Sequence, residues 1–279
     1  MNRSRVILYI GLLVPQMGFA AVALQVLNVP LVIITPVYMF TPAVAAVGAN
    51  LLMRDSLSNL GLTVSLNRWY MVAWILPPAL TAVTIFVGLS LPGINLSFTP
   101  ALFEQSGISA GSPIAATAVL FSRGMLFGAV INTGFAAGEE VGWRGLLQPE
   151  LDTYGFWKGS VAVGIVWGLW HAPLILAGHN YPNHPYLGML LMILFTISLS
   201  PIFGYLRYRT QSTIGPSLAH GTLNSVAAVP LLLLTGGTNI VIGIQGISGI
   251  AVLGIANIAL YIADRTHMDE RLSNKRIKI

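Results

Sequence analysis

Residues 117–150 read TAVLFSRGMLFGAVINTGFAAGEEVGWRGLLQPE. Most of this stretch is apolar, and it is longer than the roughly 20 residues that a helix needs to cross a bilayer once. We therefore predict one long helix that is tilted or broken. Glu139, Glu140 and Arg144 interrupt the stretch, although only 8% of the chain carries a formal charge. Charged groups in hydrocarbon are costly unless paired or hydrated, so these residues are the first candidates for function.

The composition of the whole chain is that of a membrane protein. It has 279 residues, 55% of them hydrophobic, and a mean hydropathy of +0.76, which is too apolar for a soluble globular protein of this length. Strand-type alternation with a period of two is absent. We predict an all-α polytopic membrane protein whose roughly eight transmembrane helices enclose an intramembrane polar cavity. The expected spans are 6–27, 31–53, 69–91, 117–150, 158–178, 186–206, 213–234 and 240–262.

Lysine and arginine are distributed unevenly between the predicted loops. With a cytoplasmic N-terminus, the outside loops near 28–30, 92–116, 179–185 and 235–239 contain neither residue. Cytoplasmic loops favour Lys and Arg, so eight crossings with both termini in the cytoplasm fit the rule. We expect an integral, multi-pass protein of a prokaryotic cell membrane. The inside segments hold Arg3, Arg5, Arg54, Arg68, Lys158, Arg207, Arg209, Arg265, Arg271, Lys275, Arg276 and Lys278.

A single integral membrane domain is expected over residues 1–279, with a motif core at about 117–234 and a basic cytoplasmic tail at 263–279. The first apolar run is longer than the core of a usual signal peptide, and we interpret it as a retained helix. The loop 92–116 is expected to carry a short interfacial helix around 101–105. The chain has no cysteine, which excludes disulfides and thiolate chemistry. The net charge of +5 is explained by the loops and the tail facing lipid, so no nucleic acid partner is expected.

The charged stretch separates into a pair and a single carboxylate. On a helix, Glu140 and Arg144 are four residues apart and can neutralise each other. Glu139 points about 100° away and has no cation at the neighbouring helical positions. The alternative is that the stretch is a solvated helix end at the cytoplasmic surface. Glycines along the same helix would allow other helices to approach closely; they are Gly134, Gly138, Gly142 and Gly145.

Further polar residues fall in two later spans. His171 lies within WGLWH, where the simple alternative is a core histidine bonded to a backbone carbonyl. His220 and Asn224 are four residues apart and share a helical face, where the alternative is hydrogen bonding between helices. Arg123, in the fourth span, has no assigned role. The histidines outside the spans are expected to be solvent-exposed: His179, His184 and His267.

Taken together, this inventory suits activation of a water molecule for peptide hydrolysis. A carboxylate can accept a proton, and a neighbouring histidine can orient the water. A second histidine and a carboxamide can donate hydrogen bonds to an oxyanion. The predicted spans place His171 and His220 at depths that differ by roughly 9 Å, given about 1.5 Å of rise per residue. Tilted helices or a kink at Pro173 would have to close this gap.

Three motifs in order resemble a known family. EEVGWR (139–144) fits EExxxR, WGLWH (167–171) is similar to FxxxH with Trp167 in place of Phe, and HGTLN (220–224) fits HxxxN. They resemble the signature of the CAAX-protease and bacteriocin-processing (Abi) family of intramembrane endopeptidases, which includes the type II CAAX prenyl endopeptidase. Pro216 also departs from the family, which often has an aromatic residue there.

The resemblance implies roles for individual residues. Glu139 and His171 would activate water, and His220 and Asn224 would form the oxyanion hole. The substrate would be a membrane-associated peptide or protein, with or without a prenyl group, in a cavity that opens toward the cytoplasm. The lipid bilayer would be the other partner. Supporting roles fall to Glu140, Arg144 and Trp167.

Alternative functions remain open. A zinc protease would use Glu139, His171 and His220 as ligands. However, no HExxH helix is present, and Asn224 is a poor zinc ligand but a good oxyanion donor, so we expect no cofactor. The same polar residues can also form a proton or ion pathway in a transporter or channel. A non-catalytic scaffold or immunity protein with this fold is the third alternative.

Overall fold

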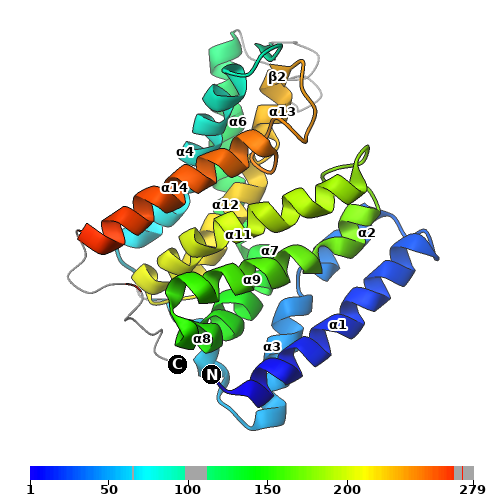
Figure 1. The fold of residues 1–279 in the computed structure, drawn as a ribbon, viewed down its shortest axis with the longest axis vertical. Helices are drawn as coiled ribbons and strands as arrows, with labels where there is room; N and C mark the ends of the chain where they lie inside the picture. The colour runs from blue at the N-terminus through cyan, green and yellow to red at the C-terminus, as the bar shows by residue number, and fades with distance from the viewer. Residues whose placement is uncertain (65, 98–111, 267–271, 273–279) are drawn as a thin grey trace.

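The computed structural model describes residues 1–64, 66–97, 112–266 and 272. Helices dominate this part of the chain, and two short strands form the one small sheet within it (Figure 1). The interfacial helix expected around 101–105 and most of the basic tail lie outside the described residues. The α-helices are α1 (Arg3–Gln25), α2 (Leu31–Tyr38), α3 (Thr41–Met53), α4 (Arg68–Leu89), α6 (Pro113–Phe127), α7 (Thr133–Glu140), α8 (Gln148–Leu151), α9 (Phe156–Trp170), α10 (Ala172–Leu176), α11 (Pro185–Thr210), α12 (Ile214–Val226), α13 (Val229–Leu233) and α14 (Ile247–Thr266).

Shorter elements complete the fold. Two 3₁₀ turns lie in loops, and two π-helical segments join α6, α7 and α8 into one long path. Strands β1 and β2 are antiparallel and pair over two residues each. The elements are η1 (Leu57–Leu60), η2 (Gly128–Asn132, π), η3 (Val141–Leu147, π), η4 (Asp152–Tyr154), β1 (Asn95–Leu96) and β2 (Leu234–Thr235).

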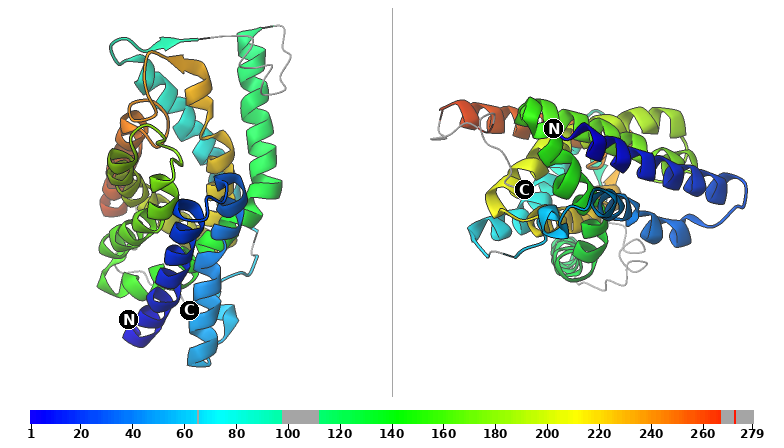
Figure 2. Two further views of the ribbon diagram at one scale, coloured as in Figure 1. Left: turned by 90° about the vertical axis from the view of Figure 1, so that its right-hand side faces the viewer. Right: turned by 90° about the horizontal axis from the view of Figure 1, so that it is seen from below.

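The chain is a multi-pass integral membrane protein. In its described part, seven helical stretches are long and apolar enough to cross a bilayer. The predicted span 213–234 does not qualify, because it is broken between α12 and α13 at residues 227–228. It still runs across the molecule beside α6 (Figure 2). The prediction of an all-α membrane fold with about eight crossings is confirmed, with this one crossing made of two short helices.

The fourth span is the long, broken helix that its length predicts. It runs from Ile114 to Tyr154 and changes to π-helical geometry twice, at η2 and at η3. A π segment holds an extra residue per turn and often occurs at functional sites. Glu139 and Glu140 are the last residues of α7, so the second change of geometry begins directly after them.

Glycines let neighbouring helices approach this long helix. A β-carbon on Gly142 would lie 2.5 Å from the β-carbon of Pro42 in α3, and one on Gly138 would lie 2.7 Å from the carbonyl oxygen of Met39. Gly145 similarly faces η1. The predicted close packing is therefore confirmed at three positions. At Gly134 it is wrong, since a β-carbon there would meet nothing within 4 Å.

Several loops that lie near arginine residues meet at one face of the molecule. Arg5 at the start of α1 binds Glu150 of α8 at 2.9 Å, and it also forms an ion pair with Asp55 after α3. The loops 54–67 and 211–213 join through a hydrogen bond from the Thr213 amide to the Gly61 carbonyl, 2.8 Å long. We call this the basic face, whose described parts are residues 54–64, 66–67 and 211–213 with the start of α1.

The remaining long loops meet at a second face. The strand pair joins loop 90–97 to loop 234–246. Tyr181 of loop 177–184 donates a hydrogen bond of 2.7 Å to the backbone oxygen of Gln245, and Asn239 donates one to the backbone oxygen of Asn180. We call this the neutral face, formed by loops 90–97, 177–184 and 234–246, which contain no Asp, Glu, Lys or Arg.

Candidate active site

Glu140 is the centre of a buried polar network. Nη1 of Arg144 lies 3.0 Å from the Glu140 carboxylate, and both side chains are completely buried. The predicted ion pair is therefore present, and the alternative of a solvated helix end is wrong. Nη2 of Arg144 also donates to Ser200 of α11 at 2.9 Å. The guanidinium lies 4.7 Å from the ring of Trp167. A buried ion pair needs such extra partners to offset the loss of water.

Glu140 also forms a hydrogen bond with His220, the histidine of the third motif. Nδ1 of His220 lies 2.8 Å from Oε1 of Glu140. A carboxylate oxygen accepts, so Nδ1 carries the proton and Nε2 is the atom that faces the cavity. One carboxylate thereby holds both Arg144 and His220 in place. This contact joins helices that are 80 residues apart in sequence, and it could not be predicted from spacing within either motif.

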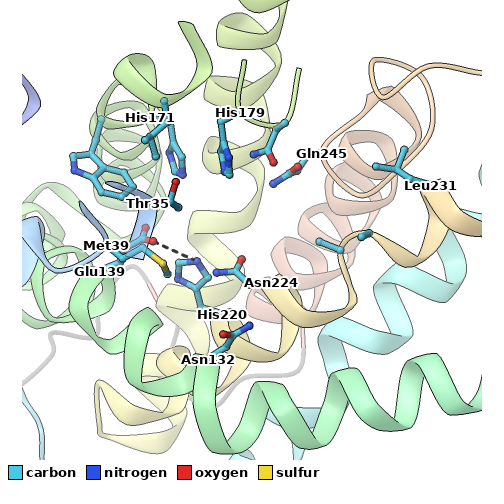
Figure 3. Close-up of a pocket in the computed structure, with 15 residues that line it drawn as sticks. Thr35, Met39, Asn132, Glu139, His171, His179, His220, Asn224, Leu231 and Gln245 are labelled. Carbon is cyan, nitrogen blue, oxygen red and sulfur yellow. Dashed lines mark ion pairs between the residues drawn. The ribbon is translucent and has the colours of Figure 1, made fainter. Parts of the chain in front are cut away.

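Glu139 is buried, and within the part of the chain that the structure describes it has no ion-pair partner other than a protonatable histidine. Its Oε1 lies 3.9 Å from Nε2 of His220 (dashed in Figure 3). As expected, Glu139 has no cation at the neighbouring helical positions; instead, two neutral indole groups donate to Oε2. The Trp167 N–H lies at 2.8 Å and the Trp143 N–H at 3.5 Å. These donors hold the carboxylate without neutralising its charge.

His171 ends helix α9, directly before the short helix α10. Its Nδ1 lies 2.9 Å from the carbonyl oxygen of Trp167. Because a carbonyl can only accept, Nδ1 carries the proton and Nε2 keeps a lone pair. The backbone contact expected of a core histidine is thus present, but it leaves the other nitrogen able to accept a proton.

The two histidines lie in one cavity despite their different positions along their helices. The Trp167 ring centroid is 6.0 Å from that of His171 and 5.2 Å from that of His220. Both rings therefore lie beside the same indole, and the distance between them expected from the spans is closed. Glu139, His171, His220 and Asn224 all line the same cavity of about 340 Å³ (Figure 3).

Several lining residues escaped the sequence analysis. Asn132 lies in η2, donates to Ser225 at 2.8 Å and lines the cavity. The sequence feature that could have identified Asn132 is a polar amide side chain within an otherwise apolar span. His179 was expected to be solvent-exposed and is instead partly buried in the cavity wall, together with Gln245. Their positions depend on how loops 177–184 and 234–246 fold over the helices, which no local pattern reveals.

A metal site would need at least three suitable ligands around one point. Among the residues that the structure describes, no group of three His, Asp or Glu side chains is arranged to hold a metal ion. Nδ1 of His171 and Nδ1 of His220 are already engaged, so each of these two rings has only its Nε2 left for another partner. This arrangement gives no support to the alternative of a His₂Glu zinc site.

Comparison with known proteins agrees with the three motifs. Residues 119–226 match the family model described as type II CAAX prenyl endopeptidase Rce1-like. The chain resembles the Rce1-like family. A segment of 44 residues is 46% identical to CAAX prenyl protease 2 of Methanococcus maripaludis, which amounts to 15% of this chain and 16% of that relative's length. The Rce1-like match includes all four cavity residues named by the motifs.

Proposed function

We propose that this chain is an intramembrane endopeptidase that hydrolyses a peptide bond of a membrane-associated substrate without a metal ion. One observation carries the proposal: Glu139, His171, His220 and Asn224 come from three different helices and line one cavity. In an apolar protein, four such groups around one space suit a reaction that needs a base, a water molecule and an oxyanion site.

The first step is the attack of water on the scissile carbonyl carbon. Glu139 and Nε2 of His171 hold the water, and the proton leaves to one of them as the new C–O bond forms. The indole donors from Trp167 and Trp143 keep the carboxylate aimed at the cavity. A base is effective only when it is held within hydrogen-bond reach of the proton it removes.

The second step stabilises and then breaks the tetrahedral intermediate. Nε2 of His220 and the side-chain amide of Asn224 donate hydrogen bonds to the oxyanion. Since Nδ1 of His220 already donates to Glu140, this role requires the imidazolium form, which the carboxylates of Glu139 and Glu140 flank. The C–N bond then breaks, and the proton taken from water passes to the leaving amine.

The surroundings of the cavity suit a substrate that arrives through the membrane. An apolar groove of about 780 Å³ between α6 and α12–α13 shares Asn132 and Asn224 with the catalytic cavity. Its wall includes Leu126, Phe127 and Val130, which are exposed at the surface of a helix that is long and apolar enough to cross a bilayer. A lipid-attached or membrane-embedded segment can therefore lie beside the reacting groups, whether or not it is prenylated. The basic face is in the cytoplasm in this proposal, with both termini on that side.

The test is cleavage by the purified protein in detergent. A farnesylated CAAX peptide and its unprenylated twin are each incubated with the wild type and with Glu139→Gln, and the products are identified by mass. We expect cleavage by the wild type and a loss of at least about 10³-fold in the variant. Absence of cleavage of both peptides by the wild type, or equal cleavage by the variant, would overturn the proposal.

A further inference from the structure

Trp170 lies against the supports of both groups that hold the water molecule in the proposed reaction. Its indole is buried, and the centroid of its ring is 4.8 Å from that of His171, with the two rings inclined by 80°. The ring of Trp143, whose N–H donates to Glu139, makes a T-shaped contact with the same indole at 5.9 Å. This one indole therefore supports the imidazole directly and the carboxylate through Trp143.

Three contacts from the N-terminal helices hold the indole of Trp170. The ring of Tyr38 stacks on it, with centroids 4.4 Å apart and planes inclined by 8°. The Tyr38 hydroxyl donates to the backbone oxygen of Trp170 at 2.8 Å. The indole N–H of Trp170 donates to Oγ1 of Thr41 at 3.0 Å. The plane of the indole and the direction of its N–H are thereby both fixed. We call Tyr38 and Thr41 the clamp.

The two clamp residues also bind each other. The Thr41 hydroxyl donates to the backbone oxygen of Tyr38 at 2.8 Å, so its lone pairs are left to accept from the indole. Tyr38 ends α2 and Thr41 begins α3. Thr35 and Met39 of the same segment line the catalytic cavity together with His171 (Figure 3). The segment that carries the clamp is therefore also part of the cavity wall.

The clamp lies outside the segment that the motifs cover. The Rce1-like match spans residues 119–226, which include the proposed reacting groups and Trp170. The clamp belongs to the earlier apolar crossing Leu31–Met53. The motifs thus name the groups that react, whereas the clamp reaches them from a part of the chain that the motifs do not include.

We propose that Tyr38 and Thr41 are positioning residues of the reaction. They hold Trp170, and through it they keep His171 and Glu139 close enough to share one water molecule. The inference rests on the proposed endopeptidase function. Proton transfer needs hydrogen-bond reach, and a misplacement of about 1 Å can cost on the order of 10²-fold in rate. Neither clamp residue is among the described residues that line the cavity, so we expect the clamp to affect kcat and not KM.

Substitutions of Thr41 test the inference through kinetics. The purified variants are assayed with whichever of the two CAAX peptides the wild type cleaves faster. Thr41→Val keeps the shape and removes the hydroxyl, so we expect kcat to fall about 5-fold with KM nearly unchanged. Thr41→Ser retains the hydroxyl and should restore kcat to within about twofold of the wild type. Thr84→Val is the matched control, because Thr84 is buried and its hydroxyl bonds within α4.

Substitutions of Tyr38 separate its hydroxyl from its ring. Tyr38→Phe keeps the stacked ring and removes the bond to the Trp170 backbone, and we expect kcat to fall about 5-fold. Tyr38→Leu also removes the stacking, and a fall of about 50-fold is expected, again with KM little changed. The inference is wrong if kcat of both Tyr38→Phe and Thr41→Val stays within about twofold of the wild type, or if the loss appears only in KM.

Fluorine NMR of protein labelled with 5-fluorotryptophan follows the indoles without a substrate. The chain has six tryptophans, and each resonance is assigned by a Trp→Phe variant. We expect Thr41→Val to shift the resonances of Trp170 and Trp143 and to leave that of Trp157, which bonds to Asp264 elsewhere, in place. Thr84→Val should shift neither of the first two. An unmoved Trp143 resonance in Thr41→Val would show that the clamp does not reach Glu139, which would overturn the inference.

The two proposals fail in different ways. If the wild type cleaves neither peptide while the resonances of Trp170 and Trp143 shift as expected, the endopeptidase function is wrong and the clamp remains a support of the cavity wall. If the wild type cleaves peptide but Tyr38→Phe and Thr41→Val keep their kcat, the endopeptidase function stands and the present inference is wrong.

Discussion

Nδ1 of His220 lies 2.8 Å from Oε1 of Glu140, and the same carboxylate binds Arg144 at 3.0 Å. The first and the third sequence motifs are therefore held together by one buried acidic group. The hydrogen bond from Nδ1 fixes the ring of His220, so Glu140 helps to set the direction in which its Nε2 points. Glu140 acts through its neighbours, and we expect its loss to affect stability and cleavage together.

Glu140→Gln should destabilise the protein strongly. The change leaves the completely buried guanidinium of Arg144 without its counter-charge, and breaking a buried pair from one side costs about 3–5 kcal/mol. Thermal unfolding in detergent measures the effect. Glu139→Gln is the control, because its carboxylate has no Arg partner. An equal fall in Tm for both variants would contradict the special role of Glu140.

Trp167→Phe tests the indole bond to the proposed base. The variant restores the residue that the family usually has and removes a donor 2.8 Å from Glu139. We expect kcat to fall about 3- to 10-fold with KM little changed, since one hydrogen bond to a charged group is lost. Trp74→Phe removes an indole bond to the Met125 carbonyl outside the site and serves as the control. Equal kcat values in the two variants would show that the indole does not position Glu139.

Asn224→Ala tests the oxyanion role. Removing one oxyanion donor typically costs about 10²–10³ in kcat, and we expect a loss in this range with a small change in KM. Asn257→Ala is the matched control, because Asn257 bonds to the backbone of Ser198 and Leu253 away from the cavity. If kcat for Asn224→Ala stayed within about threefold of the wild type, the amide would have no part in the reaction.

Chelation tests the metal-free mechanism. We expect cleavage to be unchanged after dialysis against excess EDTA and 1,10-phenanthroline, since Glu139, His171 and His220 act without a metal in the proposed reaction. Metal analysis of the same preparation accompanies the assay. Stoichiometric zinc together with loss of cleavage on its removal, restored by added zinc, would favour the zinc-protease alternative.

The pH dependence of stability should contain a contribution from His179. Burial lowers its pKa in the folded protein, so between that value and about 6.5 the unfolded chain binds more protons than the folded one. His179 therefore does not reduce the free energy of unfolding above pH 7, and it lowers this free energy as the pH decreases through 6.5. His179→Gln should reduce the loss of Tm between pH 7 and pH 5 relative to the wild type. If the variant and the wild type lost the same amount of Tm between pH 7 and pH 5, His179 would not become harder to protonate on folding.

The features that could be predicted from the sequence are those that depend on local spacing or on the requirements of the membrane. The pair of Glu140 and Arg144 follows from four-residue spacing on a helix, and the crossings follow from apolar length and charged loops. The bond between Trp167 and Glu139 spans 28 residues and needs α9 to pack against α7, which no local pattern encodes. His179 was misjudged for the same reason, because its neighbours Asn180 and Tyr181 bond to a loop more than 50 residues later in the chain.

If the chain is the proposed endopeptidase, the size of its cavity limits what it can cleave, and the hydrogen bond from Tyr181 to Gln245 keeps two of the neighbouring loops together. A cavity of about 340 Å³ is too small to admit a folded domain. Such a volume is at the lower end of the roughly 300–1,000 Å³ that ligand pockets occupy. Only a flexible tail or linker in an extended conformation can enter the cavity. The folded parts of a target protein would therefore stay outside and remain uncleaved. Selection among target proteins would then depend on which of them expose a loose segment close to the bilayer.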